Sequence, residues 1–263
     1  MTSVAVGGLL ADWRHRRRRS QLDLAVEVGV SARHLSFVET GRSRPSPELV
    51  VALAEHLDVP LRDRNSMLLA AGYAPRYSHT PLDDAAMARV RASLQRMLDA
   101  HDPYPGVVID RQWNVVLANR AAQALTVDLP AHVLEPSLNV FRVCLHPDGL
   151  AARTLNFDDW AGYLIRQLRR LIDVTGDAGL VALEAEIHSY PGVDRVRRAA
   201  EAGHRDQPPL LVPFTVELAG HQLALFTTLT TFGTPQDVTL DELSVELFFP
   251  ADDDTDRLLT ATA

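Results

Sequence analysis

The chain has 263 residues, 46% of them hydrophobic, and a formal net charge of −8 at pH 7. That length suits one large domain or two ordinary ones, and no apolar run approaches the roughly 18 residues that span a membrane. The N-terminal apolar residues precede the basic ones, the reverse of a secretory signal, and the single Cys144 excludes an internal disulfide, so we expect a cytoplasmic protein.

Charge divides unevenly along the chain. Residues 1–76 hold 11 arginines and 8 acidic residues, whereas residues 77–263 hold 15 and 26, giving net charges of +3 and −11. A mildly basic head on an acidic body predicts that only the head meets a polyanion. We therefore expect two domains, 1–76 and 77–263.

The first domain is predicted to be entirely helical. Ser20, Ser31 and Ser46 each precede a segment with helical apolar spacing, as N-cap residues do. Gly29 and Gly41 follow the next two helices, where glycine is the favoured stop. The helix after Ser31 is therefore short and bracketed at both ends.

Two short helices joined at a glycine are typical of a helix-turn-helix, whose second helix enters the major groove of DNA. Ala25 is small enough for the helices to approach, and Leu35 and Val38 are predicted to pack the second onto the first. Arg33 suits a guanine edge, and Gln21 suits a phosphate at a helix start. The predicted DNA-binding residues are Gln21, Ser31, Ala32, Arg33, His34, Ser36, Arg42, Ser43 and Arg44.

An ordinary helical hairpin with a solvated polar face is the alternative interpretation. Within the motif, we expect Glu39 to bind Arg42, Arg44 or a nearby helix end rather than DNA. The run 16–19 of four arginines either ends a helix in solvent or contacts phosphate.

The second domain is predicted to have strands at both ends and helices between them. A linker at 76–84 and an amphipathic helix at 83–101 lead into a hairpin over 106–118, and a mostly helical middle follows. Three strands close the domain, at 210–220, 221–232 and 244–250, and 251–256 is predicted to be a solvated acidic tail. This pattern predicts an α+β domain: a small antiparallel sheet with a helical insertion.

Several of these stretches carry a family resemblance. Residues 20–75, from "SQLDLAVEVGVSARHLSFVETG" to "MLLAAGYAP", resemble a lambda-repressor-like helix-turn-helix domain of the xenobiotic-response-element (XRE) class. The phrases "PGVVIDRQWNVVLANRAAQAL", "NVFRVCLHPDGLAARTLNFDDW" and "LFTTLTTFGTPQDVTLDELSVELFFPADDDT" resemble the ligand-binding domain of MmyB-like transcription regulators. The resemblance implies an all-α DNA-binding domain followed by a PAS-like domain, with fatty-acid-type ligands in some members.

A sensing pocket in the second domain is predicted between the helix that starts at Asp158 and the strands around Phe226 and Leu247. Its predicted apolar lining is Trp113, Phe141, Trp160 and Phe226, which are otherwise simply core residues. Arg142 or Arg153 is the predicted partner of a ligand carboxylate, and the alternative is a surface ion pair for each.

The sequence contains few patterns typical of enzymes: it has no GxGxxG, Walker or GxSxG motif. His146, His188, His204 and His221 lack metal-ligand spacing, and Cys144 is interpreted as a redox sensor or, more simply, a buried apolar side chain.

We therefore expect no enzyme, no metal and no cofactor beyond a bound fatty acid or similar molecule. The expected protein is a bacterial one-component transcription regulator, a homodimer that binds double-stranded DNA and a small apolar ligand and does not bind membranes. The alternatives are a redox or enzyme-like domain fused to a DNA-binding head, and a ligand-free PAS-like dimerisation module.

Overall fold

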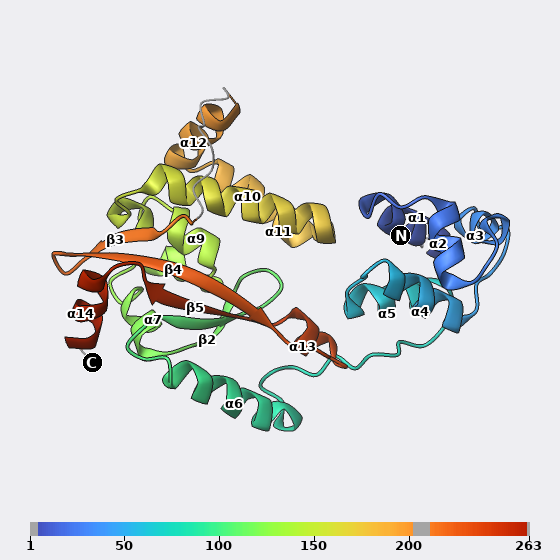
Figure 1. The fold of residues 1–263 in the computed structure, drawn as a ribbon, viewed down its shortest axis with the longest axis horizontal. Coiled ribbons are helices and arrows are strands. Elements are labelled where there is room, and N and C mark those ends of the chain that lie inside the picture. The colour runs from blue at the N-terminus through green and yellow to red at the C-terminus, as the bar shows by residue number, and fades with distance from the viewer. Residues whose placement is uncertain (1–4, 202–210, 262–263) are drawn as a thin grey trace. The chain divides into compact units, whose positions relative to one another are not determined.

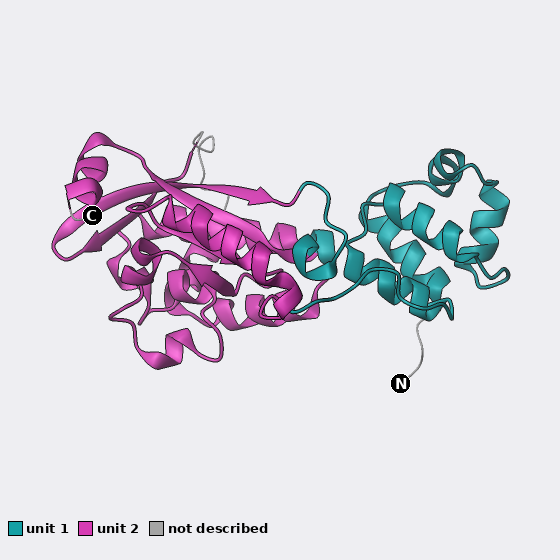
Figure 2. Ribbon diagram, turned by 90° about the horizontal axis from the view of Figure 1, so that it is seen from below, with its two compact units in different colours: residues 1–81, 173–175, 233–241 teal, residues 82–172, 176–232, 242–263 magenta. Residues whose placement is uncertain are grey.

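A computed structural model of the chain describes residues 5–201 and 211–261, and the chain forms two compact units. Unit 1 comprises residues 1–81, 173–175 and 233–241, and unit 2 comprises 82–172, 176–232 and 242–263 (Figure 2). The first unit is therefore discontinuous in sequence, because it includes a segment from near the end of the chain.

Five helices make up most of unit 1, and serine caps define three of them. Ser20, Ser31 and Ser46 each accept a hydrogen bond from the backbone N–H three residues later, as predicted. Gly29 and Gly41 have φ angles of 75° and 73°, the left-handed conformation that ends a helix. The helices are α1 (Val6–Arg16), α2 (Gln21–Val28), α3 (Ala32–Glu39), α4 (Pro47–His56) and α5 (Leu61–Ala70).

The core of unit 1 holds α3 against α1 and α2. Ala25, Leu35 and Val38 are fully buried in this core, as predicted. A Cβ atom at Gly7 would lie 2.4 Å from the carbonyl oxygen of Val38. Only glycine therefore lets α1 lie directly against the end of α3.

The segment 233–241, which connects β4 to β5, is held in unit 1 by two aspartates. Asp237 accepts hydrogen bonds from the Ser78 hydroxyl (2.7 Å) and from the Thr80 hydroxyl (2.8 Å). Burial alone would raise the pKa of Asp237, but these bonds outweigh it and hold the pKa below its usual range. Asp241, in α13 (Val238–Glu242), accepts from the Leu61 backbone N–H at 2.9 Å and so caps α5, whose N-cap residue has no side-chain cap.

Unit 2 is built on one five-stranded antiparallel sheet in the order β2-β1-β5-β4-β3. Its strands are β1 (Gly106–Ile109), β2 (Val115–Ala118), β3 (Phe214–Leu218), β4 (His221–Thr231) and β5 (Ser244–Pro250). The first hairpin and the last three strands form one sheet around the helical insertion, which confirms the predicted α+β architecture.

Helices cover both faces of this sheet (Figure 1). The outer face carries α6, and the inner face carries the helical insertion that includes α9 and α10. No helix within residues 5–201 or 211–261 is long and apolar enough to cross a bilayer. The helical elements are η1 (Ala85–Met87), α6 (Ala88–Asp99), α7 (Arg120–Ala124), α8 (Ala131–Leu134), α9 (Val140–Leu145), η2 (Leu150–Arg153), α10 (Phe157–Thr175), α11 (Ala178–His188), α12 (Pro191–Glu201) and α14 (Asp253–Ala261).

Side chains of β5 alternate between the two faces. Val245 faces α6 and lines a groove beside that helix, whereas Phe248 packs into the core under the insertion. Glu246 shares the inner face with Phe248 and is 4% exposed. A carboxyl group thus lies in the apolar interior of unit 2.

The predicted acidic tail at 251–256 is wrong, because these residues begin α14. Asp252 accepts a hydrogen bond from the Thr255 backbone N–H at 2.7 Å, and acidic residues in the first turn complement the helix dipole. The Thr255 hydroxyl is buried and accepts from the Ala224 backbone N–H at 2.9 Å. The acidic residues therefore serve as a helix start.

Candidate functional site

The exposed side of α3 carries the residues predicted to contact DNA. Ser31 and Arg33 are exposed, and His34 and Ser36 are partly exposed. The guanidinium groups of Arg33 and Arg42 lie 5.3 and 5.9 Å from the centre of the Phe37 ring. The ring therefore supports two exposed cations at the same end of the unit, where a polyanion has access to both.

Glu39, at the end of α3, pairs with Arg14 of α1. The Arg14 Nε and Nη2 atoms donate to its two carboxylate oxygens at 2.7 and 2.8 Å. Burial raises the pKa of Glu39, but the hydrogen bonds from Arg14 and Gln21 outweigh burial and hold the pKa below its usual range. Glu39 thus makes a structural contact, as predicted, but its ion-pair partner is Arg14, 25 residues earlier, and not Arg42 or Arg44.

Two predicted DNA contacts are engaged inside unit 1. The Gln21 side-chain amide donates to Glu39 at 2.7 Å, so its N–H group supports α3 instead of pointing at a phosphate. Arg44 donates through Nε to the Ala71 carbonyl at 3.0 Å and lies over the Tyr73 ring at 4.8 Å. Arg44 nevertheless remains an exposed residue, as are Ser31, Arg33 and Arg42. Ala32 and Ser43 are partly exposed.

The arginine run at the end of α1 is partly engaged in the same way. Arg17 donates to the carbonyls of Leu57 and Asp58 at 2.8 and 2.9 Å, and Arg19 pairs with Glu27. The Arg17 bonds satisfy carbonyl groups at the carboxyl end of α4, which have no partner within that helix.

An inner cavity of about 90 Å³ lies in unit 2 between the sheet and the helices α7 and α9. Its wall is apolar apart from a few polar side chains, the pattern usual for small-molecule sites. Gln123 is exposed, whereas Cys144 and Glu246 are buried, so the cavity runs from the surface at α7 into the core. The lining residues are Pro105, Val107, Val115, Ala118, Ala122, Gln123, Leu125, Thr126, Leu138, Val140, Val143, Cys144, Leu150, Phe214, Glu246 and Phe248.

Burial raises the pKa of both ionisable side chains of this lining. Burial raises the pKa of Glu246 to about 7, against a weaker opposing effect of the Thr227 hydroxyl. Burial also raises the pKa of Cys144 to about 12, so its thiol stays protonated and is a poor nucleophile. The Trp160 indole N–H faces this thiol but reaches no hydrogen-bond partner among the described residues. The arrangement favours Cys144 as an apolar wall over a redox sensor.

The four aromatic residues predicted to line a pocket lie elsewhere. Trp113 packs on Phe141 with ring centres 4.7 Å apart, and Trp160 stacks on Tyr163 at 5.2 Å. These rings belong to the packed core next to the cavity, and none is part of its lining. Phe226 lies on the outer face of the sheet, because strand alternation turns it away from the core.

Neither arginine predicted to bind a carboxylate lines the inner cavity. Arg142 donates to both carboxylate oxygens of Glu186 at 2.7 and 3.0 Å, and also to the carbonyl of Ser137. Arg153 ends η2 and is partly exposed. The surface ion pair, considered as the alternative for Arg142, is what the structure contains.

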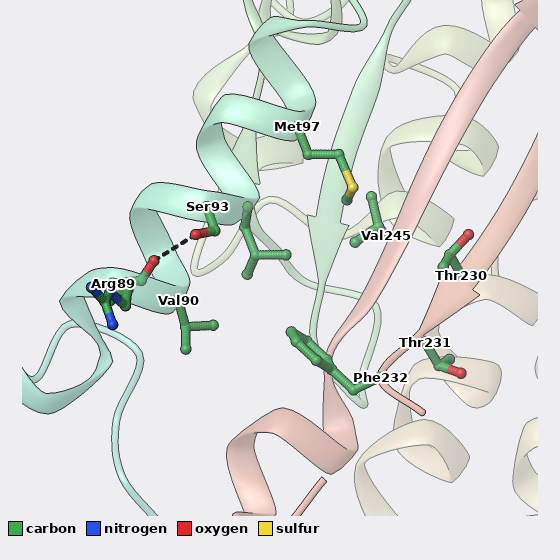
Figure 3. Close-up of a pocket in the computed structure, with 9 residues that line it drawn as sticks. Arg89, Val90, Ser93, Met97, Thr230, Thr231, Phe232 and Val245 are labelled. Carbon is green, nitrogen blue, oxygen red and sulfur yellow. Dashed lines mark hydrogen bonds between the residues drawn. The ribbon is translucent and has the colours of Figure 1, made fainter. Parts of the chain in front are cut away.

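A second, larger hollow of about 470 Å³ lies on the outer face of the same sheet (Figure 3). Val90 and Met97 of α6 face Phe232 and Val245 across it. Met97 is 40% exposed, which leaves this apolar groove open to solvent. Apolar surface of this kind marks interaction sites.

Three side chains that sequence spacing did not group lie together in unit 2. His132, His146 and Asp148 present potential ligand atoms within 4.8 Å of one another. The His132 Nε2 atom lies 3.0 Å from Asp148, and His146 Nδ1 accepts from the Asp148 backbone N–H. His188 and His221 lie on other elements, and His204 is outside the described residues. Two of the potential ligand atoms, His132 Nε2 and His146 Nδ1, are thus already in contact with Asp148.

The first unit contains two short helices joined by a tight turn, the second with a polar exposed side, which is the arrangement of a DNA-binding domain. The second unit is a sheet domain with an apolar cavity, which is the arrangement of a ligand-binding domain. Family comparisons agree: residues 5–67 match the family described as Helix-turn-helix domain, and residues 90–261 match the MmyB-like transcription regulator ligand binding domain. A comparison with curated proteins gives no match. The chain belongs to the MmyB-like family of transcription regulators, and this combination of domains is that of a one-component regulator.

Proposed function

We propose that this regulator reads operator DNA with α3 and alters its DNA affinity when an apolar, acyl-chain-like molecule occupies the inner cavity. The observation that carries the sensing part is an apolar cavity reaching from the surface to a buried carboxyl group. Family membership supports the roles of the two domains.

The DNA contact proposed for α3 rests on exposure and support. Arg33 is exposed and held over Phe37, so its guanidinium is oriented before DNA binds. An arginine in this position of a helix-turn-helix forms two hydrogen bonds with guanine. Ser31, His34 and Ser36 share its side of the helix and complete the proposed reading surface.

The ligand proposed for the inner cavity carries a fatty-acid-like acyl chain, since the lining is mostly aliphatic. A volume of about 90 Å³ has room for roughly three water-sized groups. The cavity thus accepts one end of a chain, and the remainder extends toward the exposed Gln123 or widens the space between α7 and the sheet.

The proposed assembly is a homodimer in which α6 and the groove beside it meet a second copy. Val90 and Met97 offer exposed apolar area there. A single recognition helix contacts few base pairs, whereas a dimer reads two half-sites about 10 base pairs apart.

The experiment that tests the sensing function titrates operator DNA and a series of apolar molecules against the full-length protein. We expect both a thermal shift and a change in DNA affinity of about 1–3 kcal/mol, the usual range of allosteric coupling. A ligand can move the DNA equilibrium only if it favours one of two conformations. DNA binding that no apolar molecule alters would leave a ligand-free dimerisation domain as the better description.

A further inference from the structure

Glu246 carries a carboxyl oxygen that the fold leaves unpaired. Its Oε2 atom has no hydrogen-bond partner among the described residues, although the side chain is 4% exposed. Strand alternation places Glu246 on the inner face of β5, and it lines the inner cavity. A buried polar atom without a partner costs free energy, so an occupant that bonds to it would stabilise the folded unit.

The cavity offers nothing that would hold an anion at this point. Among the described residues that line it there is no arginine or histidine, and Glu246 and Cys144 are the two ionisable members. Arg142, the cation predicted for this role, is bound to Glu186. A carboxylate placed beside Glu246 would meet a second acidic group without a cation between them.

We propose that the ligand of the inner cavity presents a hydrogen-bond donor to Glu246, as a protonated primary amine or an alcohol does, and not a carboxylate. This inference rests on the proposed function, because it names the polar end of the same ligand. The apolar chain of that ligand lies against the aliphatic lining, and its donor group reaches the buried end of the cavity.

The two candidate donors differ in how their binding depends on pH. Burial raises the pKa of Glu246 to about 7, and the titratable side chains facing it are Cys144 of α9 and Tyr163 of α10. Burial raises the pKa of both of these groups as well, so they remain neutral. An amine therefore binds more tightly as pH rises and Glu246 ionises, whereas an alcohol bonds to either form of the carboxyl group.

The test measures thermal shifts and dissociation constants for full-length protein with straight-chain amines, alcohols and carboxylates of matched length. For the wild type, we expect amines and alcohols to bind about tenfold more tightly than carboxylates of the same length. Glu246→Gln keeps the size and hydrogen-bonding ability of the side chain, so it should retain alcohol binding and abolish the preference for amines over carboxylates. Glu217→Gln, at an exposed position of β3, is the matched control and should preserve the wild-type order.

Three outcomes are distinguishable. Carboxylates that bind as tightly as amines to the wild type, with an order unchanged in Glu246→Gln, would overturn the role of Glu246 and leave the apolar sensor intact. No binding by any of the three classes would contradict the proposed sensing function itself. If Glu246→Gln does not fold, the wild type still decides, because amine binding that fails to tighten between about pH 5 and about pH 8 contradicts the proposal.

Discussion

Arg14 of α1 and Glu39 of α3 form a two-bonded ion pair at the centre of the helix-turn-helix unit. Their side chains are only 9% and 5% exposed. Glu39 also accepts from Gln21 of α2, so one carboxylate joins three helices. The pair therefore ties α3 to α1 and α2, and it makes the placement of α3 depend on a buried charge.

The first prediction concerns this ion pair. Glu39→Gln leaves Arg14 buried without its counter-charge, and we expect unfolding of unit 1 to become easier by about 3 kcal/mol. Hydrogen exchange of α1 and α3 amides in the full-length chain measures this loss. Asp12→Asn, an exposed acid on α1, is the control and should leave the exchange rates nearly unchanged. Equal effects from the two variants would contradict a structural role for the pair.

The same pair predicts a dependence on pH. The folded pKa of Glu39 is below its ordinary value, so its contribution is complete above that ordinary value and is lost as pH falls through the folded pKa. We expect wild-type amide protection in α3 to decline on acidification more steeply than in Glu39→Gln. Parallel pH profiles for the two proteins would show that the carboxylate contributes nothing.

The third prediction separates base reading from phosphate contact. Arg33→Ala should reduce operator affinity by about 1–3 kcal/mol and relax specificity at one base pair, because it removes a base-edge contact. Arg42→Ala should weaken all sequences evenly and lower the salt dependence of binding. Arg44→Ala should reduce thermal stability, since Arg44 holds the Ala71 carbonyl. Binding titrations with operator and scrambled duplexes at several salt concentrations distinguish the three results.

The fourth prediction concerns the stability of unit 2. The folded pKa of Glu246 is raised to about 7, so the folded state holds a proton that the unfolded state releases. Stability therefore falls as pH rises from the ordinary carboxyl pKa to about 7 and is level above it. We expect Glu246→Gln to raise the Tm more at about pH 8 than at about pH 5. A Tm difference between the wild type and Glu246→Gln that does not change with pH would contradict the raised pKa of the buried Glu246 carboxyl group.

The fifth prediction tests the dimer. Met97→Asp places a charge in the open groove beside α6 and should shift the protein toward monomer in light scattering, with weaker operator binding as a consequence. Ala92→Asp adds the same charge to an exposed position of α6 outside the groove and should leave the mass unchanged. Identical masses for wild type and Met97→Asp at all concentrations would exclude this surface.

Local signals predicted the helices of unit 1 well. Ser20, Ser31 and Ser46 cap helices because a hydroxyl three residues before an N–H is a contact within one turn. The same applies to Gly29 and Gly41, whose left-handed conformations depend on adjacent residues. The partner of Glu39 could not be predicted in this way, because Arg14 lies on another helix and no spacing rule joins them.

The sensor was harder to predict for a related reason. Alternation of side chains along "SVELFFP" suggests a strand with one solvent-exposed face and one buried face, but helices cover both faces of this sheet. Alternation therefore gives no sign that Glu246 is buried, and Phe226, which was predicted to line the pocket, lies on the other side of the sheet. Which side chains border a 90 Å³ space depends on packing to within one methyl group, and sequence patterns do not carry that information.

The tie between Leu61 and Asp241 also constrains how this regulator can be recombined. A chimera that joins residues 1–81 to a foreign sensor would leave the Leu61 N–H and the hydroxyls of Ser78 and Thr80 without the acceptors that Asp237 and Asp241 provide. The helix-turn-helix domain therefore does not end at the linker, and residues 1–81 alone do not make up the complete unit. In proteins of this architecture, we expect the DNA-binding domain and the ligand-binding domain to be inherited together. An exchange should preserve the fold only when the β4–β5 connection is transferred with the helices that it completes.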